Sequence, residues 1–411
     1  MAGHIQDRWY KTEKGPDGKE IRVRTARYGT GMRYRARYVA PDGQERSKSF
    51  PDRQRRQAED WLTRIEADMS RGQYVDPKAA RMTFQQYGEQ WLASQSGDPN
   101  TKASMRSQLG LHAFPLIGAR PLGSFQPSHI REFVAKLEAA GMSGSYARVI
   151  FSNVRAILSS AVDDGHILRN PCNARTVSLP AMPQRRVTPW TRERVLAVRG
   201  AITERYRACV DMGAGCGLRQ GEILGLAVEE LDFENGVLHV VQQLKLSLNK
   251  AVFAAPKGGK LRDVPLPDPV AEALKAHMER FPPVEITLPW MRSGGTPTTR
   301  HLVFSGVGGG PVWRGPLNED HWKPALAAAG VIPRAKSREH EAAREHGMHA
   351  LRHFYASMLL DAGESIKAVS EYLGHSDPGL TLRVYAHLMP ASRDRARKAI
   401  GAAYNPPNPA H

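Results

Sequence analysis

Four short segments in the second half of the chain concentrate side chains that bind phosphate, move protons or attack as nucleophiles. They are GCGLRQGEILGL at 215–226, PKGGKLRDVPL at 256–266, HALRHFYASMLLDAG at 349–363 and YLGHSDPGLTLRVYAH at 372–387. Their candidate reactive residues are Arg219, Lys257, His349, Arg352, His375 and Tyr385. The planar guanidinium of arginine matches phosphate oxygens in pairs and does not lose its proton. Two such cations with a hydroxyl nucleophile suit phosphoryl transfer.

The order of these residues, and the sequence around each of them, resembles the tyrosine recombinase, or lambda-type phage integrase, family. Members of this family attack a DNA phosphodiester with a tyrosine hydroxyl and form a 3′-phosphotyrosyl bond. The resemblance implies that Tyr385 is the nucleophile, and that Arg219 and Arg352 clamp the non-bridging oxygens. It also implies an integrase that integrates and excises a phage or another mobile element.

The same resemblance assigns the other reactive side chains. It implies that Lys257 is the general acid that protonates the leaving 5′-oxygen, and that His375 hydrogen-bonds the phosphate. His349 lies three residues before Arg352, on the same face of a helix. We expect His349 to help accept the proton of Tyr385 and to bind phosphate.

Three neighbouring residues complete the expected site. Glu222 follows Arg219 by one helical turn, and we expect it to orient that arginine rather than to react. Lys260 lies in the same glycine turn as Lys257 and is the alternative general acid. His353 has no assigned role and is interpreted as a structural residue.

Neither a cofactor nor a metal ion is expected. The sequence has no GxxxxGK[ST] loop, no HExxH motif and no acidic metal cluster. A phosphotyrosyl bond conserves the energy of the phosphodiester it replaces, so strand joining needs no nucleotide hydrolysis. The three cysteines lack CxxC spacing and are expected to pack as small apolar residues, not as disulfides or zinc ligands: Cys172, Cys209 and Cys216.

The overall charge favours a polyanionic partner. The 411 residues include 58 Lys and Arg against 41 Asp and Glu, a formal net charge of +17. The resemblance specifies double-stranded DNA, bound at core and arm attachment sites by a homotetramer. A directionality factor and a host DNA-bending protein are further candidate partners. No apolar window is long enough to span a membrane and no secretory signal is visible, so we expect a cytoplasmic protein of a bacterial cell, associated with the nucleoid.

The elements that position these residues predict an α+β multidomain fold. Residues 1–75 predict a small β-sheet with a helix on one face. Met32–Tyr38 alternates between apolar and basic residues, which places Arg33, Arg35 and Arg37 on one face of a strand. This domain resembles the arm-type DNA-binding domain of phage integrases. A merely solvated strand face is the alternative interpretation of the arginines.

The rest of the chain predicts two more domains and a tail. Residues 82–173 are predicted to be all-helical, with Thr83 capping the first helix, and resemble the family's helical core-binding (SAM-like) domain. Residues 187–395 predict a mixed, mainly helical catalytic domain of the tyrosine recombinase type. Its expected strands lie at 237–242, 263–266 and 302–304.

Two segments of this half are less well defined by the sequence. Residues 396–411 form a C-terminal tail, and 392–403 have the composition of a short basic helix. Related recombinases pass such a segment to a neighbouring protomer. The charged stretch 333–346 has no assigned role.

Two other functions remain open from the sequence. Type IB topoisomerases share the Arg-Lys-Arg-His-Tyr chemistry but relax DNA as monomers, whereas the arm-like first domain favours recombination. A catalytically silent DNA-binding accessory protein could use the same fold, but the complete set of reactive residues argues against it.

Overall fold

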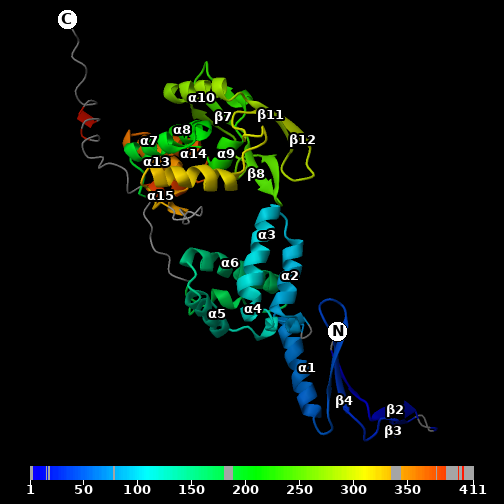
Figure 1. Ribbon diagram of the computed structural model, residues 1–411. Coiled ribbons are helices and arrows are strands. Elements are labelled where there is room, and N and C mark those ends of the chain that lie inside the picture. Colours follow the sequence, from blue (N-terminus) through cyan, green and yellow to red (C-terminus); the bar gives the residue numbers. More distant parts are fainter. Residues whose placement is uncertain are drawn as a thin grey trace. The chain divides into compact units, whose positions relative to one another are not determined.

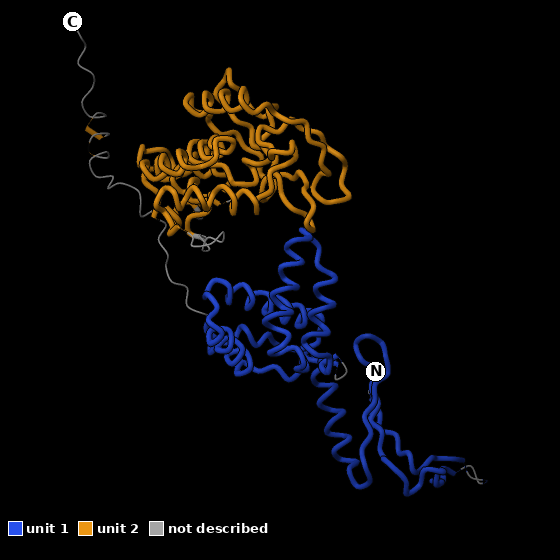
Figure 2. The backbone as a smooth tube through the Cα atoms, viewed as in Figure 1, with its two compact units in different colours: residues 1–183 blue, residues 184–411 orange. Residues whose placement is uncertain are grey.

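The protein is described from a computed structural model. It divides into two compact units, residues 1–183 and residues 184–411 (Figure 2). The three-domain division made from the sequence is finer than these units and stays a prediction. No helix in the described part of the chain is both long and apolar enough to cross a membrane. The described residues are 3–14, 16, 19–76, 79–179, 188–334, 344–375, 377–385, 397, 400 and 401.

The first unit begins with a three-stranded antiparallel sheet in the order β1-β4-β5 (Figure 1). These strands are β1 (His4–Asp7), β4 (Tyr34–Val39) and β5 (Glu45–Phe50), and helix α1 (Arg55–Ser70) covers one face of the sheet. A two-stranded hairpin of β2 (Tyr10–Lys14) and β3 (Glu20–Arg24) follows β1. The predicted alternation is confirmed within β4, where three apolar side chains are buried against α1: Tyr34, Ala36 and Tyr38. It is wrong for Met32, which precedes the strand and is 47% exposed.

The remainder of the first unit is helical, as predicted. Thr83 forms a capping box, in which its Oγ1 accepts from the Gln86 backbone N–H at 3.2 Å and the Gln86 Oε1 accepts from the Thr83 N–H at 3.1 Å. The longest of these helices, α6 (Gly144–Asp163), buries one face in the helical core, because an apolar residue recurs on that face at nearly every turn. The helices are α2 (Phe84–Ser94), α3 (Pro99–Gln108), α4 (Phe114–Ile117), α5 (Pro127–Ala139) and α6 (Gly144–Asp163).

The second unit has a small sheet in the order β10-β7-β6. Its strands are β6 (Leu231–Asp232), β7 (Val237–Val240) and β10 (Arg262–Pro265), so the predictions of strands at 237–242 and 263–266 are confirmed. The helices before and after this sheet are α7 (Arg192–Ala201), α8 (Arg207–Gly215), α9 (Gln220–Leu224), α10 (Asp268–Arg280), α11 (Arg314–Pro316), α12 (Lys323–Ala328), α13 (His349–Asp361), α14 (Ile366–Leu373) and α15 (Pro378–Tyr385).

Two β-hairpins of this unit were not predicted. They pair β8 (Gln243–Ser247) with β9 (Lys250–Ala254), and β11 (Val284–Pro289) with β12 (Pro297–Leu302). The prediction of a strand at 302–304 is wrong, because β12 ends at Leu302 where its pairing with β11 stops. The hairpins share a small apolar core of their own: Ala227, Phe253, Ile286 and Leu302.

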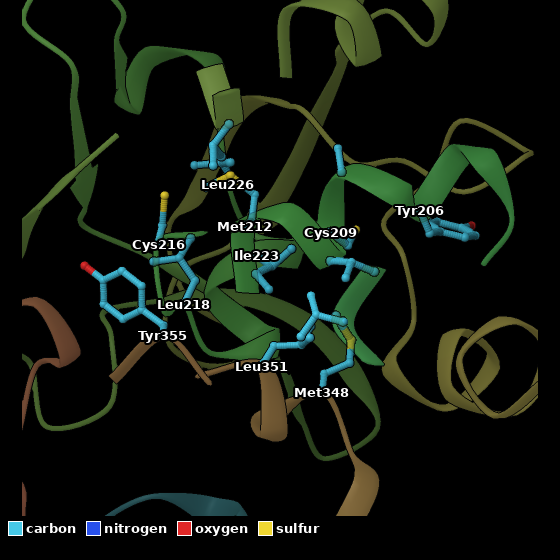
Figure 3. Close-up of a cluster of buried hydrophobic side chains, with 14 of the residues drawn as sticks. Tyr206, Cys209, Met212, Cys216, Leu218, Ile223, Leu226, Met348, Leu351 and Tyr355 are labelled. Carbon is cyan, nitrogen blue, oxygen red and sulfur yellow. The ribbon is translucent and has the colours of Figure 1, made fainter. Parts of the chain in front are cut away.

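Helices α8 and α13 pack together in the main core of this unit. Figure 3 shows part of this core, with Met212 and Cys209 from α8 and Leu351 from α13. The helices approach closely at Gly213, where a Cβ would lie 2.8 Å from Leu351. All three cysteines are buried and free, which confirms that they pack as small apolar side chains. Most of the charged stretch 333–346, and nearly all of the chain beyond Tyr385, lies outside the described residues.

Candidate active site

Arg219 stands immediately before α9, after a turn that requires glycine. Gly217 has a φ of +64°, and a Cβ at this position would lie 2.3 Å from the ring of Tyr355. The Glu222 carboxylate accepts hydrogen bonds from the Arg219 backbone N–H and from its Nη1, both at 2.8 Å. Arg219 Nη2 donates to the carbonyl of Gly374 at 3.3 Å. The guanidinium is therefore held in one orientation from two sides.

A third arginine, Arg262 of β10, completes this network. Its Nη1 and Nη2 donate to the two oxygens of Glu222 at 3.0 and 2.7 Å, and its Nε donates to the carbonyl of Tyr372 at 2.6 Å. Burial alone would raise the pKa of Glu222, but the hydrogen bonds and charges of Arg262 and Arg219 outweigh it and hold that pKa at about 2. Glu222 is therefore an anion shared by two arginines.

Arg352 lies on the inner face of α13 and is only 1% exposed. Its Nη1 donates to the carbonyl of Gly217 at 2.7 Å, and its Nη2 donates to the carbonyl of Leu373. Burial, and then the charge of Arg219, lowers the pKa of Arg352 to about 9, so the side chain stays cationic at neutral pH. The Arg352 guanidinium thus links the turn before α9 to the end of α14 through hydrogen bonds to both.

Three histidines surround these cations. His375 Nδ1 lies 2.8 Å from the hydroxyl of Thr381, and burial followed by the Arg352 charge lowers the pKa of His375 to about 4. The His353 ring is half-buried, and the same two causes lower its pKa to about 4. Burial by the surrounding protein, followed by the effects of His353 and of the Arg352 charge, lowers the pKa of His349 to about 4 as well. All three imidazoles are therefore neutral at pH 7.

Tyr385 ends α15 with its side chain buried. Its hydroxyl lies 2.6 Å from His353 Nδ1, and the rings of the two residues are 5.6 Å apart. Burial raises the pKa of Tyr385 to about 12, against an opposing effect of the Arg352 charge. The hydroxyl is therefore protonated at neutral pH and shares a hydrogen bond with the imidazole.

The two candidate general acids have different surroundings. Lys260 Nζ donates to the backbone carbonyl of His375 at 3.1 Å. Lys257 is exposed in the turn between β9 and β10 and forms no hydrogen bond or ion pair with any other residue that the structure describes. Gly258 and Gly259 separate the two lysines and both have positive φ. Lys260 is therefore hydrogen-bonded to the cluster of reactive residues formed by Arg219, Arg352, His349, His353, His375 and Tyr385, whereas Lys257 is not.

The three arginines near β4 lie in the first unit and are largely engaged in pairs. Arg33 donates to Asp52 at 2.9 Å and to Asp7 at 3.0 Å, and its side chain is 18% exposed. Arg37 pairs with Glu45 at 2.9 Å, whereas Arg35 donates to the neutral Ser47 hydroxyl at 2.9 Å. Their DNA contact stays a prediction, and Arg33 has a structural partner on each side.

Two known protein-family patterns match this chain, one in its helical middle part and one in its second half. The pattern of the "Phage integrase central domain" matches residues 84–176, and that of the "Phage integrase family" matches residues 191–391. The second range contains all six candidate reactive residues, and the two ranges together cover most of the chain. The chain belongs to the phage integrase family. It is a site-specific tyrosine recombinase.

Relatives of this recombinase include proteins that match nearly all of its length. It is 25% identical over 397 residues to a protein described as a prophage phiRv2 integrase of Mycobacterium tuberculosis, covering 95% of this chain and 97% of the relative. It is 27% identical over 289 residues to a "Tyrosine recombinase XerC-like" protein of Caldanaerobacter subterraneus, covering 66% of this chain and 69% of the relative.

Solved structures of integrases share the fold of this recombinase. The Tn1549 transposon integrase, solved with a circular intermediate DNA, matches with a TM-score of 0.64 and 22% identity over 78% of this chain and 99% of that one. A lambda integrase tetramer bound to a Holliday junction matches with a TM-score of 0.53 and 17% identity over 84% and 93% of the two chains. The predicted α+β architecture with an amino-terminal sheet, a helical core and a mixed catalytic domain is confirmed.

Two residues near the reactive cluster of this recombinase were not singled out from the sequence. Arg262 was noted only as part of the PKGGKLRDVPL segment, although it binds Glu222 through both nitrogens of its fork. His353 was interpreted as structural, although it contacts the Tyr385 hydroxyl. The helical spacing of His353 from His349, four residues, is the local signal that places the two rings together.

Proposed function

We propose that this recombinase is an integrase that cuts and rejoins double-stranded DNA through a 3′-phosphotyrosyl bond to Tyr385. The observation that carries the proposal is the burial of the Tyr385 hydroxyl beside Arg352, within a cluster that also contains Arg219. A phenol among arginines suits attack on a phosphodiester, because cations stabilise the charge that develops on the phosphate oxygens.

The charges of the cluster favour an anionic ligand. Glu222 is hydrogen-bonded to two guanidinium groups, those of Arg219 and Arg262, and its charge is the anionic one that acts on the third, Arg352. Arg352 is buried and its two hydrogen-bond partners in the described part of the chain are neutral carbonyls. Burying a cation in this way costs free energy, and a bound phosphate would offset that cost.

The hydrogen bonds of the cluster leave the two clamping arginines with free donors. A guanidinium has five N–H groups. Among the described residues, Arg219 uses two side-chain N–H groups, toward Glu222 and Gly374, and Arg352 uses two toward carbonyls. Each arginine is thus oriented and still able to bind non-bridging oxygens. We assign His375 and His349 to the same phosphate as neutral hydrogen-bonding groups.

Proton delivery to the leaving 5′-oxygen falls to a lysine of the β9–β10 turn. We assign it to Lys257, which extends from the glycine turn without a partner in the described part of the chain, and keep Lys260 as the alternative. The phosphotyrosyl bond then preserves the energy of the broken phosphodiester, so a free 5′-hydroxyl can reverse the reaction.

The biological role that follows is movement of a phage or another mobile element into and out of a chromosome. Residues 1–75 would bind arm sites and the other two domains would hold the core site, as four protomers assemble on DNA. A directionality factor and a host DNA-bending protein are the accessory partners that such a reaction uses. Its chromosomal substrate places the reaction in the bacterial cytoplasm, on the nucleoid.

Trapping of the covalent intermediate tests the proposal. A plasmid carrying the DNA that flanks the gene for this chain serves as substrate, and a duplex nicked beside the mapped cleavage point serves as the core-site duplex. The wild-type protein should form an adduct that resists denaturation, and Tyr385→Phe should bind equally and form none. An adduct with Tyr385→Phe would contradict the proposal, and relaxation of plasmid without any attachment site would favour a topoisomerase.

A further inference from the structure

The hydroxyl of Tyr385 has a specific partner that the assignments above leave without a function. His353 Nδ1 lies 2.6 Å from the hydroxyl oxygen, which is a short hydrogen bond. The two residues come from different helices, α13 and α15, and are separated by 32 positions in the sequence. Such a contact exists only because tertiary packing brings the first half of α13 against the end of α15.

The contact has the geometry of a proton donor and its acceptor. A neutral imidazole carries one protonated and one unprotonated nitrogen. In the tautomer that carries its proton on Nε2, the unprotonated Nδ1 of His353 accepts a hydrogen bond from the protonated Tyr385 hydroxyl. Oxygen-to-nitrogen transfer along a bond of this length needs no movement of either side chain.

The groups around His353 explain why its proton affinity would depend on DNA. His349 and Arg352 face it from α13, His375 approaches from the segment before α15, and Tyr385 faces it from α15. Among these groups Arg352 is the cation that disfavours a protonated imidazole. A phosphate bound to Arg352 would neutralise that effect and favour protonation of His353.

We propose that His353 is a catalytic residue that accepts the proton of the Tyr385 hydroxyl as the phenolic oxygen attacks the scissile phosphate. This inference rests on the proposed function. The O–H bond breaks and an N–H bond forms at Nδ1, while the Tyr385 oxygen bonds to phosphorus. The bond from phosphorus to the 5′-oxygen breaks, and that oxygen takes a proton from the lysine. In strand joining both protons return along the same paths.

Three substitutions separate the proton acceptor from a structural side chain. His353→Asn places an amide oxygen near the position of Nδ1 and can accept a hydrogen bond without holding a proton. His353→Gln extends toward the position of Nε2 instead, and His353→Ala leaves room for added imidazole. His301→Asn is the matched control, because His301 lies on β12 and pairs with Glu229 outside the cluster.

The measurement is the single-turnover rate of adduct formation on the core-site duplex between pH 5 and 9, with DNA affinity and thermal unfolding measured in parallel. All three His353 variants should bind DNA like the wild type and form adduct about 100-fold more slowly. Imidazole should restore the rate of His353→Ala in proportion to its neutral fraction. His301→Asn should match the wild type.

Other outcomes overturn the inference. Wild-type rates in His353→Ala, rescue by His353→Asn alone, or absence of imidazole rescue would each show that His353 does not take the proton. The proposed function fails separately, if the wild type forms no adduct or if Tyr385→Phe retains it. An inactive Tyr385→Phe beside fully active His353 variants would therefore reject this inference and leave the proposed function intact.

Discussion

At the scale of single residues, the two lysines of the β9–β10 turn give the sharpest chemical test. A general acid is needed only when the leaving group must be protonated. Lys257→Ala should slow cleavage of the normal 5′-oxygen substrate by about 100-fold or more. A substrate with a 5′-bridging sulfur leaves without a proton and should restore most of the rate. If sulfur rescues Lys260→Ala and not Lys257→Ala, the role belongs to Lys260, which already contacts His375.

The low pKa of Glu222 predicts that the free energy of unfolding depends on pH. Its pKa is about 2 in the folded protein against an ordinary 4.5, so acid protonates the unfolded chain first and favours unfolding. The stabilisation should be complete above about pH 4.5 and should be lost as the pH falls toward 2. Glu222→Gln should lower the free energy of unfolding at pH 7 by about 3 kcal/mol, because it leaves Arg262 buried without its anion.

Urea unfolding at pH 7, 4 and 3 checks this prediction. Glu272→Gln is the control, because its carboxylate lies exposed on α10. The wild type and the control should lose stability over this range more steeply than Glu222→Gln. Equal pH dependence of all three proteins would show that Glu222 is not the group responsible.

At the scale of elements, the arginines at the start of β4 and within it differ in how strongly they stabilise the sheet: Arg33 pairs with two aspartates, whereas Arg35 and Arg37 each have one partner on β5. Arg33→Ala leaves Asp7 and Asp52 without their shared partner and should cost about 1 kcal/mol of stability. Arg35→Ala and Arg37→Ala should each change stability by less than about 0.5 kcal/mol. The last two should weaken binding to DNA flanking the core site, because an arginine on a strand face can enter the major groove.

Thermal unfolding and gel shifts on flanking and core DNA measure the two effects on the same proteins. If a double Arg35→Ala, Arg37→Ala variant binds flanking DNA normally, the two arginines belong to a solvated strand face and do not bind DNA. Loss of core binding with flanking binding intact would contradict the arm assignment of this sheet.

At the scale of the whole molecule, separate domains for arm and core DNA predict that integration can be lost while cleavage of core DNA is kept. A protein lacking residues 1–75 should still form the Tyr385 adduct on the core-site duplex. It should fail to integrate, because binding two sites at once raises the effective concentration at the weaker one. Integration between plasmids is the readout, with adduct formation as the internal control. Full integration by the truncated protein would refute an arm-binding role.

The sequence by itself determined what kind of chemistry this protein performs. The reactive side chains lie in short motifs, and each reactive residue can be recognised from the residues directly around it in the sequence. Local periodicity also determined the elements of the fold whose apolar spacing is regular, such as β4 and α6. Thr83 was readable as a helix cap for the same reason, since capping acts over three residues.

Tertiary structure alone decided how those side chains are held. Arg262 and Glu222 are 40 positions apart, and His353 and Tyr385 are 32 apart, so no local pattern indicates that they meet. Arg33 lies just before β4, and its partners come from elsewhere: Asp7 from β1 and Asp52 from the segment after β5. Periodicity reports which face of an element is apolar, whereas hydrogen bonds and charge pairs depend on which distant element packs against that face.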